Sequence, residues 1–314
     1  MLVQDGMVGR LIAGRFSKAE RARQRSKIHL DDAALSLKMQ QRYYCALRKL
    51  LPTIERCKCA DDLDVKICNW IRHMWKSGEP LLYIGDGLCA MHFFMPWSKG
   101  KVPGAWKLFA VWRRLEVPSR APPLTWDLVK SFSSYELSLG RHEMSSLLLL
   151  AFHCLLRTGE LLQLYPEDIL LGRSHGVLSL KGTKSGKRNA ANESISITNE
   201  LVVESLRSLL SHRQQCGGPS QPLWSSSHAA FRSRFKVLCE RFDVQHHAFR
   251  PYSLRRGGAT DLFQRTRSME CALLRGRWES SRVARIYISD GLSFLPSLRF
   301  TPKTQSMMKR FSYD

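Results

Sequence analysis

The sequence feature that most constrains the fold is a short proline-rich segment, residues 118–123, between two long stretches of helical pattern. It reads Pro-Ser-Arg-Ala-Pro-Pro. Proline removes a backbone donor and disfavours helix in the residue before it, so no helix is expected to run through this segment. The length of 314 residues also favours two domains. We therefore expect a folded domain on each side of this linker.

The region before the linker, residues 29–117, is predicted to be an all-helical domain. Apolar residues recur in it at the three- and four-residue spacing of a helix face. Asp31 or Asp32 is placed to begin the first helix, which is expected to run towards Pro52. Later helices are expected to begin at Asp61 or Asp62, to lie near Tyr83 to Phe94, and to place Ala105, Phe109, Trp112 and Leu115 on one face.

The formal net charge of +22, from 49 Lys and Arg against 27 Asp and Glu, favours a polyanionic partner. Basic residues are interleaved with aromatic ones, which makes nucleic acid the expected partner. Residues 1–28 are interpreted as a basic N-terminal arm, either lying along DNA phosphates or solvated. In the helical domain, the cations expected to face a phosphate backbone are Lys107, Arg113 and Arg114.

The nine cysteines do not form a disulfide or metal-binding pattern. They are scattered and odd in number, which is typical of a reducing compartment. Cys57, Cys59 and His73 offer a partial zinc set, but no second metal-binding pair accompanies them. The longest apolar run, 147–156, is about half of what a membrane-spanning helix needs. We expect no metal and no membrane contact, and a location inside the cell on DNA: the nucleus in a eukaryote, the cytoplasm or nucleoid otherwise.

Residues 124–314 are predicted to be mostly helical with a small β-sheet. Thr125 is expected to cap the first helix after the linker, and a long apolar helix is expected from Arg141 to Leu164. Alternation predicts a β-hairpin with strands at 177–180 and 195–197. Further helices are expected at 201–212, at 231–242 and over much of the chain up to Tyr287.

Four short patches in this region supply the groups that DNA cleavage without a metal requires. A phosphodiester that becomes pentacoordinate gains negative charge, which planar, bidentate guanidinium groups stabilise. The reaction also needs a nucleophile and an acid that protonates the leaving 5′ oxygen. The four patches are Arg157-Thr-Gly-Glu160, a Lys-rich hairpin around Lys184, Tyr252-Ser-Leu-Arg255, and Gly276-Arg-Trp278 followed by Tyr287.

In this order and at these intervals, the patches resemble the active site of tyrosine recombinases, the family of phage-type integrases and site-specific DNA recombinases. Tyr287 follows Trp278 by nine residues, and Trp278 follows Arg255 by twenty-three, both usual for the family. The resemblance covers 124–290; the helical domain fits the family's core-binding domain in size, helicity and charge. Two departures are the missing Thr-Gly before Arg157 and Tyr252 in the place of a histidine.

The resemblance implies a role for each residue of the patches. Arg157 and Arg255 would bind the scissile phosphate, and Lys184 on the hairpin would be the general acid, with Lys181 as the second choice. Tyr287 would attack the phosphorus and form a 3′-phosphotyrosyl link. Trp278, beside it, would donate its indole N–H to the phosphate, and Tyr252 would donate a hydrogen bond. Further DNA contacts are expected from Lys181, Lys187 and Arg188.

The resemblance also implies an architecture: a helical core-binding domain and a mixed α+β catalytic domain that form a C-shaped clamp on duplex DNA. Neither a metal nor another cofactor is needed, since the covalent link conserves the bond energy. Recombination would need a synapse, usually of four protomers, to which the segment 289–314 often lends a helix. A mobile-element recombinase is the leading interpretation. The alternatives are an inactive relic that binds DNA and a type IB topoisomerase-like enzyme.

Overall fold

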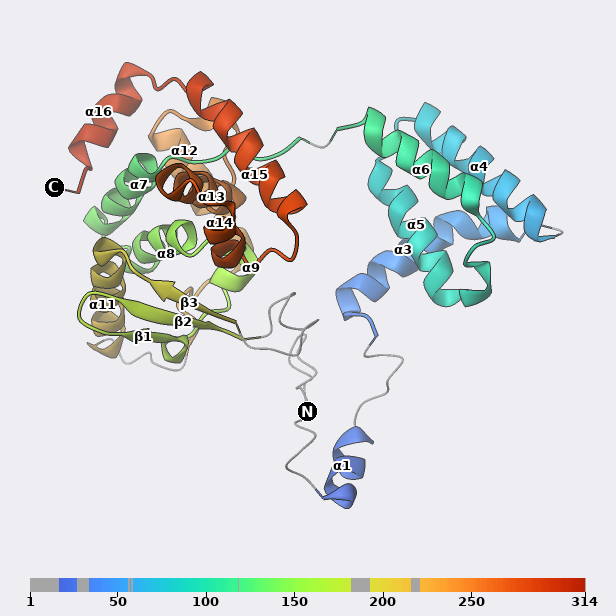
Figure 1. Ribbon diagram of the computed structural model, residues 1–314, viewed down its shortest axis with the longest axis horizontal. Coiled ribbons are helices and arrows are strands. Elements are labelled where there is room, and N and C mark those ends of the chain that lie inside the picture. Colours follow the sequence, from blue (N-terminus) through green and yellow to red (C-terminus); the bar gives the residue numbers. More distant parts are fainter. Residues whose placement is uncertain are drawn as a thin grey trace. The chain divides into compact units, whose positions relative to one another are not determined.

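The computed structural model describes residues 17–26, 34–55, 57, 59–117, 119–181, 193–215 and 221–313. The chain divides into two compact units, Met1–Ser119 and Arg120–Asp314, called the first and second unit below (Figure 1). The described residues are mostly helical, with a three-stranded antiparallel sheet in the second unit. This confirms the predicted fold class. Within these described ranges, no helix is long and apolar enough to cross a membrane.

The first unit is a helical bundle built on apolar stripes. Its core contains Leu50 of α3, Ile67 and Ile71 of α4, Ile84 of α5 and Trp112 of α6, all at most 4% exposed. Leu115, predicted on the same face as Trp112, is instead 68% exposed, because it is the last residue of its helix. The helices are α1 (Lys18–Arg25), α3 (Leu37–Ile54), α4 (Ala60–Lys76), α5 (Leu81–Phe94) and α6 (Pro103–Leu115).

The starts of two helices in the first unit differ from the predicted ones. Ser36 caps α3, since its hydroxyl accepts from the backbone N–H of Met39, while Asp31 and Asp32 lie outside the described residues. Cys59 caps α4, with its sulfur accepting from the Asp62 N–H at 3.4 Å. The predicted cap at Asp61 or Asp62 is therefore wrong.

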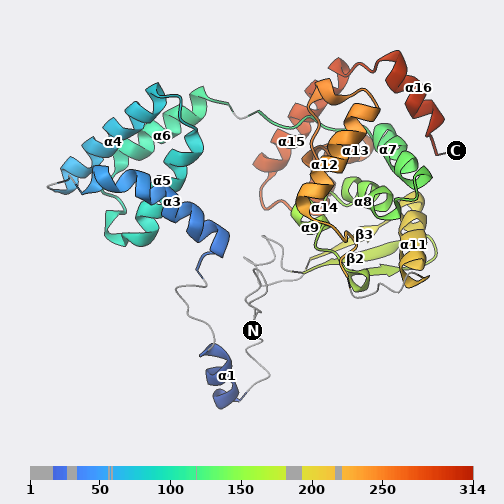
Figure 2. The same ribbon diagram turned by 180° about the vertical axis from the view of Figure 1, so that it is seen from behind.

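The second unit surrounds α8, an almost wholly buried helix. Helices α7, α11 and α13 pack against α8, and α11 lies beside the sheet in both views (Figures 1 and 2). Thr125 caps α7 as predicted, with its hydroxyl accepting from the Leu128 N–H. The helices are α7 (Trp126–Ser138), α8 (His142–His153), α9 (Thr158–Leu161), α11 (Glu200–Gln215), α12 (His228–Arg241), α13 (Tyr252–Thr266), α14 (Met269–Gly276), α15 (Ser281–Phe294) and α16 (Pro302–Arg310).

The sheet contains the predicted hairpin and one further strand. β2 (Gly176–Leu180) pairs with β3 (Glu193–Ile197), and Leu178 lies opposite Ile195. β1 (Ile169–Leu171) adds an outer strand that the sequence did not indicate, because three residues are too few to show alternation. Leu178, Ile195 and Ile197 turn into the core.

The single helix predicted from Arg141 to Leu164 is wrong. α8 ends at His153, and a second short helix, α9, begins only at Thr158. Between them Leu155 has a φ of +48°, a left-handed conformation that interrupts the helix. The apolar sequence gives no sign of this break, because Leu155 and its neighbours are buried on both sides of it.

The C-terminal segment packs on its own unit. Phe294, Leu298 and Phe300 lie against the core of the second unit. The hydroxyl of Thr304, which is fully buried, donates to the carbonyl of Phe242 at 2.7 Å. α16 is thereby attached to α12 of the same chain.

Candidate active site

The break between α8 and α9 positions Arg157. Arg157 has an extended backbone directly before α9, and its N–H donates to Oε2 of Glu160 at 2.9 Å. Its guanidinium forms an ion pair with the other oxygen of the same carboxylate. The Arg157 side chain is 33% exposed, whereas that of Glu160 is 9% exposed. Glu160 therefore fixes the position of Arg157 and leaves part of its guanidinium accessible to solvent.

Arg255 of α13 is held against the same break. It is 1% exposed, and its guanidinium donates to the carbonyl of Leu155 and, at 2.6 Å, to the carbonyl of Gly276. The left-handed turn at Leu155 thus presents a carbonyl to an arginine 100 positions further along the chain. Two carbonyls fix the orientation of Arg255 without neutralising its charge.

The electrostatics of the arginine cluster favour an anion. Burial and, to a smaller extent, the charges of Arg157 and Arg277 lower the pKa of Arg255 to about 9, against the opposing effects of Glu160 and Tyr252. Burial raises the pKa of Glu160, but Arg277, together with the backbone and side chain of Arg157, brings it below its ordinary value. Glu160 is therefore ionised at neutral pH. A bound phosphate would stabilise the charged form of Arg255 further.

The aromatic residues of the site lie over this cluster. The guanidinium of Arg255 lies 4.9 Å from the ring centre of Trp278, and that ring lies 4.9 Å from the ring of Tyr287. The hydroxyls of Tyr252 and Tyr287 are hydrogen-bonded to each other. Tyr252 is 37% exposed. The structure thus brings Tyr252, which takes the place of a histidine, into direct contact with Tyr287, the predicted nucleophile.

A second buried arginine supports the ring of Tyr287. Arg256, 4% exposed, lies with its guanidinium 5.5 Å from that ring centre and pairs with Asp290 at 3.0 Å. Arg120 pairs with the same carboxylate at 2.8 Å. Burial raises the pKa of Asp290, but the hydrogen bonds and charges of the two arginines lower it below its ordinary value. Arg256 was not predicted to belong to the site, although it directly follows Arg255 on the same helix.

The structure describes only the base of the Lys-rich hairpin. Lys181, 58% exposed in its side chain, pairs with the buried carboxylate of Asp168 at 2.6 Å. This contact raises the pKa of Lys181. Lys184, Lys187 and Arg188 lie outside the described residues.

Arg277 is a further buried arginine of the site, and it was not among the residues predicted from the sequence. Its side chain is 6% exposed, and it pairs with Glu160 at 2.6 Å and with Glu193 of β3 at 3.3 Å. It also donates to the carbonyl of Cys154 at 3.3 Å. Burial lowers its pKa, and both carboxylates oppose this. Glu160 is therefore shared by Arg157 and Arg277.

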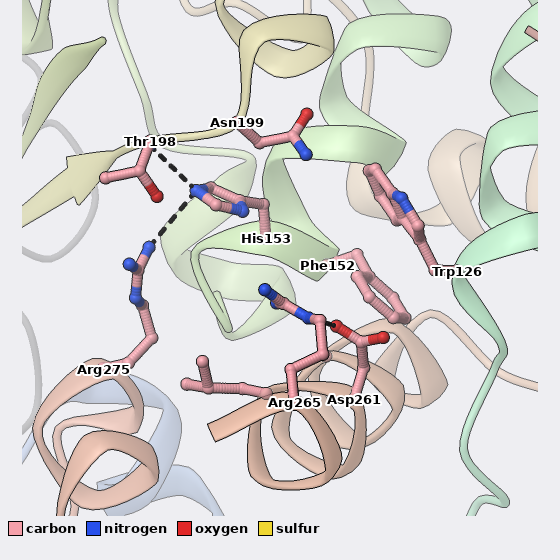
Figure 3. A pocket seen from close by; sticks show the side chains of 10 residues that line it. Trp126, Phe152, His153, Thr198, Asn199, Asp261, Arg265 and Arg275 are labelled. Carbon is pink, nitrogen blue, oxygen red and sulfur yellow. Dashed lines mark hydrogen bonds and ion pairs between the residues drawn. The ribbon is translucent and has the colours of Figure 1, made fainter.

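A pocket of about 180 Å³ lies on the second unit at the end of α8 (Figure 3). His153 accepts from the N–H of Thr198 at 3.1 Å and lies 3.3 Å from a nitrogen of Arg275, which also donates to the carbonyl of Ser196. Burial, then the charges of Arg275 and Arg265, lower the pKa of His153 to about 4. A neutral His153 therefore connects the end of α8 to the residues after β3.

The cations predicted to face DNA from the first unit lie on its surface. Lys107, Arg113 and Arg114 of α6 are all exposed. Among the described residues, no cluster of three or more His, Cys, Asp or Glu side chains is arranged to hold a metal ion. Cys59, part of the partial zinc set, caps α4 instead.

Comparison with solved structures identifies the fold. The XerH site-specific recombinase bound to palindromic difH substrate in a post-cleavage complex matches with a TM-score of 0.58 and 15% identity, over 88% of this chain and 81% of that one. The Tn1549 transposon integrase in complex with transposon right end DNA matches with a TM-score of 0.60 and 14% identity, over 93% and 97%. A lambda integrase dimer bound to a COC′ core site gives 0.50 and 17%, over 89% and 83%.

No protein-family model and no curated protein sequence matches this chain. At identities of 14% to 17%, the structural matches establish the fold, which is that of tyrosine recombinases.

Proposed function

We propose that the protein is a tyrosine recombinase that cleaves and rejoins duplex DNA through a 3′-phosphotyrosyl intermediate. The observation that carries this proposal is the convergence of four separated segments on one place. Arg255 donates to the Leu155 carbonyl in the break that precedes Arg157, and its guanidinium lies against the ring of Trp278, which in turn contacts the ring of Tyr287. The fold of the chain, shared with XerH and the Tn1549 integrase, supports the same function.

In the proposed reaction, the hydroxyl oxygen of Tyr287 attacks the phosphorus, and the bond to the 5′ oxygen breaks. Arg157 and Arg255 stabilise the charge on the non-bridging oxygens. Lys184 gives its proton to the leaving 5′ oxygen. Tyr252 relays the phenol proton, since it accepts the Tyr287 hydrogen at its oxygen and releases its own to water. Rejoining reverses these steps with a different 5′ hydroxyl.

Tyr252 limits the efficiency of the proposed reaction. The oxygen of a neutral phenol is a weaker proton acceptor than an imidazole nitrogen. Because its hydroxyl contacts that of Tyr287, a histidine in its place would face the same group. We expect Tyr252→His to preserve or raise the cleavage rate and Tyr252→Phe to lower it about 10-fold or more.

Covalent capture on DNA tests the proposed function. The protein is incubated with a random-sequence supercoiled plasmid library and quenched with SDS, and the ends of protein-linked DNA are sequenced, with Tyr287→Phe in parallel. We expect 3′ adducts at recurring sites with the wild-type protein and none with the variant, because the variant lacks the nucleophile. Adducts that persist in Tyr287→Phe would contradict the proposal.

The same assay separates two alternative functions. Adducts without any sequence preference would favour an enzyme like a type IB topoisomerase. Tight binding without adducts would favour a relic that binds DNA but no longer cleaves it, and Tyr252, in the place of a histidine, is the observation that favours this second function.

The partners follow from the proposed function. We propose that both units bind double-stranded DNA as a clamp, the first unit as a core-binding domain (29–117) and the second as a catalytic domain (124–314), joined by the linker 118–123. Four protomers would then form the synapse on two duplexes. The protein would act on DNA inside the cell, as a recombinase of a mobile element, without a metal or another cofactor.

A further inference from the structure

Arg277 connects three segments that carry different parts of the proposed active site. Its guanidinium pairs with Glu160, the residue that holds Arg157. It pairs with Glu193, the first residue of β3, which directly follows the Lys-rich hairpin. Its own backbone immediately precedes Trp278, nine residues before Tyr287. No other described side chain makes ion pairs with both of these carboxylates.

The backbone of Arg277 is unusual for an arginine. Its φ is +54°, in the left-handed region that glycine favours at the end of a helix. The preceding residue, Gly276, serves a different need: a Cβ there would lie 2.2 Å from Cζ3 of the Trp278 ring. The positive φ at position 277 would therefore favour a glycine there as well. The contacts of the side chain offset the cost of an arginine there.

The donors of Arg277 point into the protein. It donates to the carboxylate of Glu160 at 2.6 Å and to the carbonyl of Cys154 at 3.3 Å, whereas its contact with Glu193 at 3.3 Å is an ion pair rather than a hydrogen bond. Its Nη2 also lies 3.5 Å from the carbonyl of Leu155, which accepts from Arg255. Two carboxylates compensate the charge of Arg277, whereas the carbonyls around Arg255 leave its charge available to a phosphate. It acts on the reaction through the residues that it holds.

We propose that Arg277 is a positioning residue for strand cleavage. Through Glu160 it orients Arg157, and through Glu193 it holds the end of the Lys-rich hairpin in register with the segment that carries Trp278 and Tyr287. This inference rests on the proposed function. It adds a link between the phosphate-binding arginines, the hairpin and the nucleophile.

The protein contains a matched control. Arg267 ends α13 as Arg277 ends α14, also in the left-handed region, with a φ of +53°, and it is exposed. Arg267→Gly and Arg277→Gly remove the same charge and relieve the same backbone conformation. They differ in the ion pairs that the substitution removes.

The test measures the single-turnover cleavage rate at saturating DNA, the DNA affinity and the melting temperature of the full chain. We expect Arg277→Gly to cleave about 10- to 100-fold more slowly, the usual effect of misplaced reacting groups, with DNA affinity close to that of the wild type. Arg267→Gly should cleave within about twofold of the wild type, as surface changes do. Arg277→Lys should be intermediate, because an ammonium cannot span both carboxylates in the same way.

Two further measurements distinguish positioning from a loss of folding. Added guanidinium ion should partly restore cleavage by Arg277→Gly, but not by Tyr287→Phe. If Arg277→Gly does not fold, Glu193→Gln, which removes only the ion pair next to the hairpin, should still lower cleavage at saturating DNA about threefold or more.

Wild-type cleavage by Arg277→Gly at saturating DNA would overturn the inference, and so would unchanged cleavage by Glu193→Gln where the first variant does not fold. In either case the adducts of the wild-type protein and their loss in Tyr287→Phe would leave the proposed function intact. If the wild-type protein forms no adduct, both the proposed function and the positioning role of Arg277 are contradicted.

Discussion

In the first unit, the cations assigned to DNA project from the surface of α6, whereas in the second unit Arg255 and Arg256 are 1% and 4% exposed. Exposed cations on long side chains give affinity for any polyanion, and salt weakens that affinity. Buried guanidinium groups, fixed by carbonyls and carboxylates, point in set directions and interact strongly with charge that develops nearby. This contrast fits the proposed function, in which the first unit binds DNA and the second acts on one phosphate.

The interiors differ in the same way. Among the described residues of the first unit, Ser98 is the buried polar side chain, and its hydroxyl donates to the Met95 carbonyl. The second unit buries several arginines together with Glu136 and Asp168. Removing one partner of such buried charges is costly, since the other is left uncompensated. Substitutions should therefore have larger effects in the second unit, which variants in both units can test.

Arg255→Lys should have the largest effect. An ammonium cannot replace a planar guanidinium that donates to the carbonyls of Leu155 and Gly276 and that, in the proposed reaction, binds the phosphate. We expect cleavage at saturating DNA to fall about 10²- to 10³-fold. The measurement is single-turnover cleavage of a substrate recovered by covalent capture.

The control for this variant is Arg42→Lys in the first unit. Arg42 makes three hydrogen bonds to the carboxylate of Asp86, at 2.7, 2.8 and 3.2 Å, but its side chain is 40% exposed. Cleavage should stay within about twofold of the wild type. Equal losses in the two variants would refute the contrast between the units.

Gly258→Ala should be the next largest change, and it acts on stability. A Cβ on Gly258 would lie 2.0 Å from the carbonyl oxygen of Phe152, and backbone cannot yield as a side chain can. We expect the second unit to lose about 3 kcal/mol of unfolding free energy, measured by calorimetry of the full chain.

Gly85→Ala in the first unit is the matched comparison. There the new Cβ would meet the tip of the Phe109 ring at 3.1 Å, which can shift, and alanine favours the helix. The change in unfolding free energy should stay within about 1 kcal/mol. A larger loss in Gly85→Ala than in Gly258→Ala would reverse the expected order.

Glu160→Gln should change how stability depends on pH. The pKa of Glu160 is lowered on folding, so its carboxylate stabilises the second unit above its unfolded pKa of about 4.3, and this stabilisation is lost as the pH falls through the lower, folded value. Below about pH 4.3, the free energy of unfolding measured with denaturant should therefore fall more steeply with decreasing pH in the wild type than in the variant. Parallel curves for the two proteins would show that Glu160 gains nothing from Arg157 and Arg277.

Replacing Lys107, Arg113 and Arg114 by glutamine should have the smallest effect on the folded protein. These side chains are exposed, so the melting temperature should hardly change. DNA affinity should fall, and the slope of log affinity against log salt should weaken by about 0.9 for each phosphate that the protein no longer neutralises. Fluorescence anisotropy with a labelled duplex at several salt concentrations measures both. An unchanged slope would show that these three residues do not contact DNA phosphates.

Elements that depend on neighbouring residues could be predicted from the sequence. The cap at Thr125, α5 and the strands β2 and β3 follow from side-chain spacing and capping chemistry, and the structure contains them. Arg255, Trp278 and Tyr287 could be selected because their intervals match a known pattern. The structure places these three side chains next to one another, and their roles stay a prediction.

Features set by distant residues could not be predicted. The break after His153 depends on Arg255, which takes the carbonyl of Leu155, and on Gly258, which lets α13 approach α8. Arg277 could not be recognised either, because its partners Glu160 and Glu193 lie far from it in sequence.

The sequence by itself thus determined the mostly helical class with a small sheet, and the identities of the arginine, tryptophan and tyrosine candidates, since periodicity and spacing are local properties of a chain. Only the tertiary structure decided where the apolar run breaks, which carboxylate two arginines share and which hydroxyl faces Tyr287. The physical reason is that a buried charge is tolerable only where distant segments bring it a partner, and those partners meet only when the chain has folded.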